Sequence, residues 1–241
     1  MNKKASFENI NGKNIFNILT EPSTSNKKII IMSHGFRGSS VGPVRAFVDL
    51  EQILLKAGYS VLRFDQPNSG NSDGDFVNSS FNEWVSTLIH FAKKYLDLGY
   101  RVALLGQSMG ATTTMIASAS DELINRISCI ILWVPDPKST FDKNPNDFYK
   151  EGSQKYKGTF WQEAKDSNFF EALEKYSGKI HLVYGEKDRY IDDSLKERVI
   201  KKIEEKGQPF TILKGENHSD WDFDISQNVY KEELEFLEKS F

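Results

Sequence analysis

The sequence predicts an α/β fold with a mostly parallel central sheet and helices on both faces. Short apolar segments alternate along the chain with longer amphipathic ones, as in strands connected by helices. Several apolar segments are continuous runs of Val, Ile and Leu, which indicates strands covered on both faces. The 241 residues, of which 39% are hydrophobic, suffice for one large domain with a substantial core.

The strands follow in order from the N-terminus. The turn Asn11-Gly12, between an extended stretch and the segment Ile15–Leu19, predicts a β-hairpin. The carboxyl ends of parallel strands meet at one edge of a sheet, so residues directly after each strand are where a site is expected. Six further strands are predicted: Lys28–Ser33, Ser60–Phe64, Arg101–Gly106, Ile127–Val134, Lys179–Tyr184 and Pro209–Leu213.

Helices are predicted between these strands. Ser80 and Glu83 form a capping-box pattern ahead of an amphipathic segment that stops near Gly99. Small residues from Ala111 to Ala119 suit a helix packed closely on a sheet. A third helix is indicated by apolar residues spaced four apart: Ile191, Leu195, Val199 and Ile203. A fourth is indicated by the periodic last segment, Val229–Phe241.

Composition excludes several classes of protein. The 31 basic and 34 acidic residues give a net charge of −3, which does not favour a nucleic-acid or anionic-membrane partner. The single cysteine, Cys129, excludes an intrachain disulfide and a cysteine-built zinc site, and its apolar surroundings indicate a buried thiol. With no export signal and no apolar stretch of about 18 residues, we expect a cytoplasmic protein without a membrane span.

A candidate nucleophile follows the strand that begins at Arg101. The segment Gly106-Gln107-Ser108-Met109-Gly110 is a G-x-S-x-G motif between a predicted strand and a predicted helix. A serine at such a sharp turn adopts a strained backbone, and neighbours two positions away come too close for side chains. The helix start also directs backbone N–H groups toward the serine. Ser108 is therefore the predicted nucleophile.

The chain has four histidines from which the general base can be selected. His90 lies within a predicted helix and His181 within a predicted strand, whereas His34 and His218 follow strands. A base must reach the serine and move protons, which a loop residue such as His218 can do. We expect His34 to hold its loop by hydrogen bonding.

The acid that orients the base should follow another strand. Asp188, after the strand that ends at Tyr184, gives the chain order Ser108, Asp188, His218. Asp136 is the alternative acid, and the nearby Glu186 suits the role less well.

Two backbone N–H groups are needed to stabilise an oxyanion. One is expected from Met109, the residue after the nucleophile. The other is expected from Phe36 in the loop after the first parallel strand, with Arg37 and Gly38 as alternatives.

Five segments together resemble the α/β-hydrolase superfamily of serine hydrolases, over about residues 28–221: SHGFRG, VLRFDQPNSGNSDG, LLGQSMGA, LVYGEKDRYI and GENHSD. Within it the chain looks most like microbial carboxylesterases of the cinnamoyl/feruloyl esterase type. The resemblance implies hydrolysis of small carboxylic esters through an acyl-enzyme, with no cofactor or metal. One departure bears on specificity, because the loop Asp65–Ser72 lacks the arginine and first glycine of the D-x-R-G-x-G-x-S pattern common in relatives.

The resemblance also implies a short helical cap after the sixth strand. Residues 135–178 would form this cap, and residues 1–134 and 179–241 the hydrolase core. The cap segment holds nine aromatic residues in 44, enough for an apolar or aromatic acyl pocket. The residues expected to bind substrate are His34, Trp133, Phe160 and Trp161.

The sequence is also compatible with other functions. The same three residues would serve a thioesterase, a lysophospholipase or a monoacylglycerol lipase. They would also serve a serine aminopeptidase, although those relatives usually carry a larger cap. A binding protein without activity is a further alternative, but it would be expected to have lost the serine, histidine or aspartate.

Overall fold

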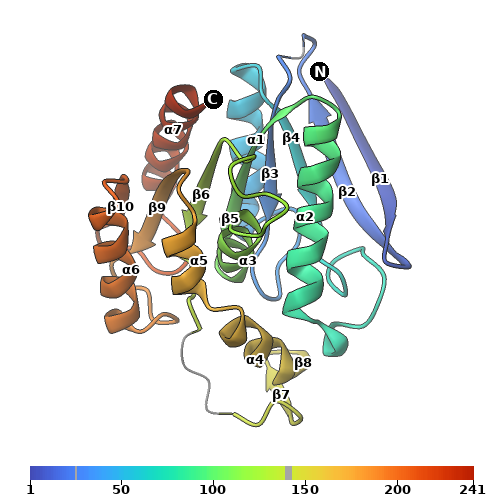
Figure 1. Cartoon of the computed structure of the whole chain (residues 1–241), viewed down its shortest axis with the longest axis vertical. Coiled ribbons are helices and arrows are strands. Elements are labelled where there is room, and N and C mark those ends of the chain that lie inside the picture. Colours follow the sequence, from blue (N-terminus) through green and yellow to red (C-terminus); the bar gives the residue numbers. More distant parts are fainter. Residues whose placement is uncertain (25, 139–142) are drawn as a thin grey trace.

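The computed structural model describes residues 1–24, 26–138 and 143–241 and confirms the predicted α/β architecture. Within these residues, eight strands form one sheet in the order β1-β2-β4-β3-β5-β6-β9-β10, with helices packed around it (Figure 1). A separate pair, β7 and β8, lies beside α4 at one end of the molecule. The strands are β1 (Asn2–Ile10), β2 (Lys13–Glu21), β3 (Lys28–Ser33), β4 (Ser60–Phe64), β5 (Arg101–Gln107), β6 (Cys129–Trp133), β7 (Phe148–Glu151), β8 (Gln154–Lys157), β9 (Lys179–Gly185) and β10 (Phe210–Leu213).

Apart from α4, which lies beside the β7–β8 pair, the helices cover the two faces of the sheet (Figure 1). Helices α1 and α7 contact each other, and α3 contacts both α2 and α5 in a second group. None of the helices in the described parts of the chain is long and apolar enough to span a bilayer. Their bounds are α1 (Ala46–Lys56), α2 (Phe81–Asp97), α3 (Met109–Ser118), α4 (Thr159–Asp166), α5 (Phe169–Lys175), α6 (Asp193–Glu205) and α7 (Phe223–Ser240).

The predicted N-terminal hairpin is present at one edge of the sheet. Strands β1 and β2 are antiparallel, with Ile10 opposite Lys13 across the Asn11-Gly12 turn. Strand β2 then pairs antiparallel with β4. The six remaining strands run parallel to one another, so the loops that follow them meet at one edge.

The continuous apolar strands form the core, as their sequences predict. The residues Ile29–Met32 of β3 are fully buried, which places apolar side chains on both faces of the sheet. Burial on both faces requires helices on both sides, so the composition of the strands and the position of the helices agree.

Three local features differ from the predicted elements. Helix α1 is absent from the predicted elements. Helix α7 begins at Phe223 and not at the predicted Val229, because the Asp222 side chain accepts a hydrogen bond from the N–H of Asp224. The segment between β6 and β9 holds the β7–β8 hairpin as well as helices. Its helix α5 packs on α3, so Phe169 and Leu173 belong to the main core. Phe141, one of the nine aromatic residues of that segment, lies outside the described residues.

A buried ion pair joins α1 to β4. The carboxylate of Glu51 is fully buried and contacts the Arg63 guanidinium, which is 2% exposed. Glu51 also accepts a hydrogen bond from Lys3 Nζ at 2.8 Å, and Arg63 donates to the Ser40 carbonyl at 2.6 Å. Buried charges are stable only when they are paired, so this group fixes the loop around Ser40 to the body of the fold.

Substitution Glu51→Gln should lower the free energy of unfolding by about 3–5 kcal/mol, because it leaves the buried Arg63 without a counter-charge. Urea denaturation measures the loss. The control is Glu122→Gln, which breaks the half-exposed pair with Lys93 and should change stability by about 1 kcal/mol or less. Equal losses in the two variants would contradict a structural role for the buried pair.

Candidate active site

Ser108 lies in a sharp turn between β5 and α3. Its backbone angles are φ 55° and ψ −126°, a conformation that L residues rarely adopt. The two glycines of the motif make the turn possible, because a Cβ on Gly106 would lie 2.2 Å from the Gly110 carbonyl oxygen. A Cβ on Gly110 would lie 2.1 Å from the Ser33 carbonyl oxygen. The Ser108 N–H donates to the carbonyl of Trp133 at 2.8 Å, which ties the turn to β6.

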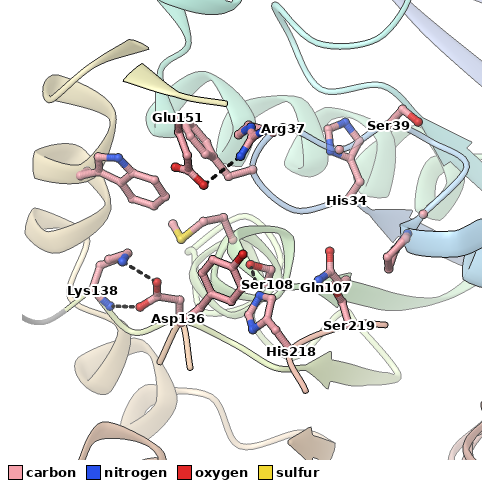
Figure 2. Close-up of a pocket in the computed structure, with 17 residues that line it drawn as sticks. His34, Arg37, Ser39, Gln107, Ser108, Asp136, Lys138, Glu151, His218 and Ser219 are labelled. Carbon is pink, nitrogen blue, oxygen red and sulfur yellow. Dashed lines mark hydrogen bonds and ion pairs between the residues drawn. The ribbon is translucent and has the colours of Figure 1, made fainter. Parts of the chain in front are cut away.

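The structure brings together Ser108, His218 and Asp188 from three different loops. Ser108 Oγ is 2.8 Å from His218 Nε2, and Figure 2 shows these two side chains pointing toward each other. His218 Nδ1 is 2.7 Å from Asp188 Oδ2. The Asp188 carboxylate is fully buried, and its other oxygen accepts the N–H of Tyr190 at 2.9 Å. With a proton on Nδ1 held by Asp188, Nε2 is free to accept the serine hydroxyl proton.

Close packing of backbone holds the loops of Asp188 and His218 together. A Cβ on Gly185, at the end of β9, would lie 2.0 Å from the carbonyl oxygen of Asn217, the residue before His218. The N–H of Lys187 donates to the Glu216 carbonyl at 2.7 Å. These contacts fix the position of the imidazole relative to the carboxylate.

The two other acids considered for this role have different partners. Asp136 forms an ion pair with Lys138 at 2.7 Å and accepts the backbone N–H of the same residue. Burial raises the pKa of Asp136, although the lysine opposes this shift. Glu186 accepts the N–H of Gly215 at 2.8 Å. Among the described residues, the carboxylate hydrogen-bonded to His218 is that of Asp188.

The expected oxyanion donors lie beside Ser108. Met109 is the first residue of α3, where the helix offers no carbonyl partner for the N–H. The loop after β3 packs directly on the serine, since a Cβ on Gly35 would lie 2.8 Å from Ser108 Cβ. Phe36, Arg37 and Gly38 of this loop all line the pocket around the serine.

His34 connects two loops from a fully buried position. Its Nδ1 lies 2.8 Å from the Gly35 carbonyl oxygen, and its Nε2 accepts the N–H of Gln66 at 2.9 Å. Burial lowers the pKa of His34, against the opposing effects of the Gly35 carbonyl and of Asp65. The neutral ring therefore holds the loops after β3 and β4 together.

The cavity beside the serine, termed the Ser108 pocket, has a volume of about 540 Å³. It is lined by residues from the loops after β3, β5, β6, β9 and β10 and from the segment between β6 and β9. Figure 2 shows two ion pairs in its wall, Arg37 with Glu151 and Lys138 with Asp136. The cavity can therefore accommodate a small molecule with polar groups.

The four residues expected to bind substrate are placed differently. Trp161 lines the pocket, and His34 lies in its wall without exposed surface. Phe160 is buried in a cluster with Trp84 and Phe36, and its ring is not among the described groups that line the pocket. The structure does not bring the Trp133 ring to the pocket, because it packs against α1 and α7 through Phe47 and Tyr230.

Several pocket residues were not anticipated from the sequence. Lys138, Glu151 and Tyr190 line the cavity, and so does the side chain of Arg37, which was considered only for its N–H. Tyr190 stands 5.1 Å from the His218 ring between centroids. Its position two residues after Asp188 was a usable signal, whereas nothing local relates Glu151 to Arg37.

Comparisons with known proteins agree with the fold. A family model for the α/β-hydrolase fold matches residues 28–154, so the chain belongs to the α/β-hydrolase fold family. No curated protein sequence matches the chain significantly. The family-model match confirms the resemblance of the sequence to this superfamily, and membership of the family supports hydrolase activity.

Solved structures show the same fold over nearly the whole chain. Est1E from Butyrivibrio proteoclasticus with ferulic acid bound has a TM-score of 0.86 and 22% identity, over 98% of this chain and 99% of that one. The α/β hydrolase GrgF from a Penicillium species has a TM-score of 0.81 and 17% identity, over 100% of this chain and 99% of that one. A monoacylglycerol lipase from Paleococcus ferrophilus has a TM-score of 0.75 and 16% identity, over 92% of this chain and 98% of that one.

The buried His34 should make the protein less stable in acid. Its pKa is lower in the folded state, so the unfolded chain takes up the proton first as the pH falls below about 6.5. Stability from the neutral ring is complete above that pH and is lost below it. Urea unfolding at about pH 7.5 and about pH 5 should show a larger loss for the wild type than for His34→Gln. Identical losses would contradict the lowered pKa.

Proposed function

We propose that this chain hydrolyses small to medium carboxylic esters through an acyl-enzyme on Ser108. The observation that carries the proposal is the continuous chain of hydrogen bonds from Ser108 through His218 to the buried Asp188. A serine hydroxyl is a weak nucleophile at neutral pH, and a base at 2.8 Å can remove its proton as the oxygen attacks.

The reaction follows from these positions. Ser108 Oγ attacks the ester carbonyl carbon while its proton passes to His218 Nε2. The tetrahedral intermediate collapses, and the alcohol leaves with the proton from His218. His218 then takes a proton from water as the water oxygen attacks the acyl carbon, and it returns that proton to Ser108 Oγ as the carboxylic acid leaves. Asp188 orients the imidazole and stabilises its cationic form.

The oxyanion of each tetrahedral intermediate needs donors that are fixed before the reaction. We assign this role to the N–H groups of Met109 and Phe36. The start of α3 supports the first assignment, because its dipole favours negative charge at that point. The second is supported by the packing of the Phe36 ring, whose centroid is 4.5 Å from that of Trp161 and 5.1 Å from that of Tyr156.

The segment between β6 and β9 supplies the cap in this proposal. The hairpin β7–β8 and helix α4 form it, since they carry Glu151 and Trp161 to the Ser108 pocket. Arg37 fixes the hairpin to the loop after β3 by donating to Glu151 at 2.9 Å and to Gln154 at 3.1 Å. Helix α5 belongs with the body of the fold.

The pocket wall supports an acyl group of limited length that carries polar substituents. A long alkyl chain would have to cover the ion pairs of Arg37 and Lys138, which is unfavourable. Trp161 lines the pocket with Lys138 Nζ 4.7 Å from its ring centroid, and in this proposal an aromatic acyl group contacts the part of the ring that reaches the cavity. Hydroxycinnamoyl esters combine both features, and the ferulic acid bound in Est1E is consistent with that class.

The main alternative is a lipase or thioesterase that uses the same three residues. The likeness to a monoacylglycerol lipase favours the former, whereas the charged pocket wall disfavours it. A peptidase of this superfamily would be expected to carry a larger cap. A panel of substrates separates these possibilities directly.

Initial rates on 4-nitrophenyl esters from acetate to palmitate, a feruloyl ester and an acyl-thioester test the proposal. Ser108→Ala should lower kcat/KM by a factor on the order of 10³ or more, because the nucleophile is lost. Asp188→Asn should lower kcat by a comparable factor, because the imidazole loses its orienting partner.

Asp136→Asn is the matched control for the acid, and its effect should be much smaller. If Asp136→Asn proved as harmful as Asp188→Asn, the assignment of the acid would be wrong. Equal rates for Ser108→Ala and the wild type on every substrate would rule out the serine mechanism.

The role of Trp161 is tested by its replacement with alanine. We expect Trp161→Ala to raise KM for the feruloyl ester by about tenfold, because the aromatic group loses its ring contact. KM for the acetate ester should stay within about twofold of the wild type. A similar change in KM for both esters would contradict selective contact with the acyl group.

A further inference from the structure

Glu233 is a fully buried carboxylate on α7 that the proposed reaction does not use. Both of its oxygens have partners, since Oε1 accepts Trp133 Nε1–H at 2.7 Å and Oε2 lies 2.7 Å from His181 Nδ1. Burial disfavours the charged imidazole, but Glu233 and the nearby Glu232 outweigh it and raise the pKa of His181. A buried charge is costly unless its partners are fixed, so Glu233 holds the Trp133 indole in one orientation.

Trp133 contacts the Ser108 turn through its backbone. It is the last residue of β6, and its carbonyl accepts the Ser108 N–H at 2.8 Å. Its ring packs against that of Trp221, with the two centroids 5.4 Å apart. One residue thus contacts the serine turn through its backbone and the segment after β10 through its ring.

Trp221 in turn holds the loop of His218. Its Nε1–H donates to the carbonyl of Asn217 at 3.1 Å, directly before the histidine. The same carbonyl oxygen packs against Gly185, where a Cβ would lie 2.0 Å away. A small shift of Trp221 would therefore move the backbone that carries the imidazole.

We propose that Trp133 and Trp221 are positioning residues that hold the His218 loop at a fixed distance from the Ser108 turn, with Glu233 fixing the Trp133 ring. Neither indole is among the described groups that line the Ser108 pocket, so these residues act on the geometry of proton transfer and not on substrate binding. The kinetic consequence rests on the proposed esterase function, whereas the effect on the loop does not.

Trp221→Phe tests the proposal, because phenylalanine keeps a ring against Trp133 but cannot donate to Asn217. We expect kcat to fall about fivefold to tenfold, as for the loss of one hydrogen bond. KM for a 4-nitrophenyl ester should remain within about twofold. Backbone amides of residues 215–220 should exchange hydrogen for deuterium faster, as measured by mass spectrometry.

A pair of variants tests the part played by Glu233. Glu233→Gln keeps an oxygen that can accept the Trp133 N–H, and its kcat should stay within about threefold of the wild type. Glu233→Leu has no acceptor and should lower kcat about tenfold at unchanged KM. Equal losses of kcat in the two variants would show that Glu233 does not act by accepting the hydrogen bond from Trp133.

Ile203→Val on α6 controls for general destabilisation. This buried residue lies away from the pocket, and losing one methylene should lower stability without changing kcat or the exchange of the loop. A Trp221→Phe protein with unchanged kcat or unchanged loop exchange would overturn the proposal. If the wild type shows no Ser108-dependent hydrolysis, the esterase function is wrong. The deuterium exchange of residues 215–220 then tests by itself whether Trp221 holds the His218 loop.

Discussion

The left-handed backbone of Ser108 is the constraint on which the arrangement of the site depends. A residue other than glycine in such a conformation costs about 1–3 kcal/mol and persists only where its surroundings fix it. Here the Trp133 carbonyl holds the amide, and α3 approaches β3 closely enough to leave no room for a side chain on Gly110. The turn directs the hydroxyl out of the sheet edge toward His218.

Two buried titratable side chains near this turn illustrate how partners decide a role. His34 has a carbonyl beside one nitrogen and a backbone N–H donor at the other, an arrangement that suits a neutral ring and a structural tie. The Asp188 carboxylate accepts a backbone N–H at one oxygen and contacts the His218 imidazole at the other, which suits a group that orients the ring. The difference follows from local donors and acceptors, because both groups are equally hidden from solvent.

Much of the fold and the positions of three site residues could be predicted from the sequence, because their signals are local. The Asn11-Gly12 turn, the continuous apolar strands and the glycines around Ser108 each encode a conformation within a few residues. His218 could be identified as the candidate base because the chain has only four histidines and only two of them follow a strand. The catalytic roles themselves stay predictions until activity is measured.

The remaining features depend on contacts between distant segments. Arg37 and Glu151 are more than a hundred positions apart, and nothing near either residue indicates the other. The direction of the Trp133 ring was equally hidden, because a strand buried on both faces lacks the alternation that tells one face from the other. The β7–β8 hairpin did carry a turn signal at Gly152-Ser153, but its short, charged strands resemble loop sequence.

Covalent labelling is the direct test of the mechanism in which His218 activates Ser108 as a nucleophile. The protein is incubated with a fluorophosphonate, and intact mass and peptide mapping locate the adduct. We expect one adduct per chain on Ser108, absent from Ser108→Ala and formed much more slowly in His218→Ala. Labelling at another residue, or labelling of Ser108 at the same rate without the histidine, would contradict it.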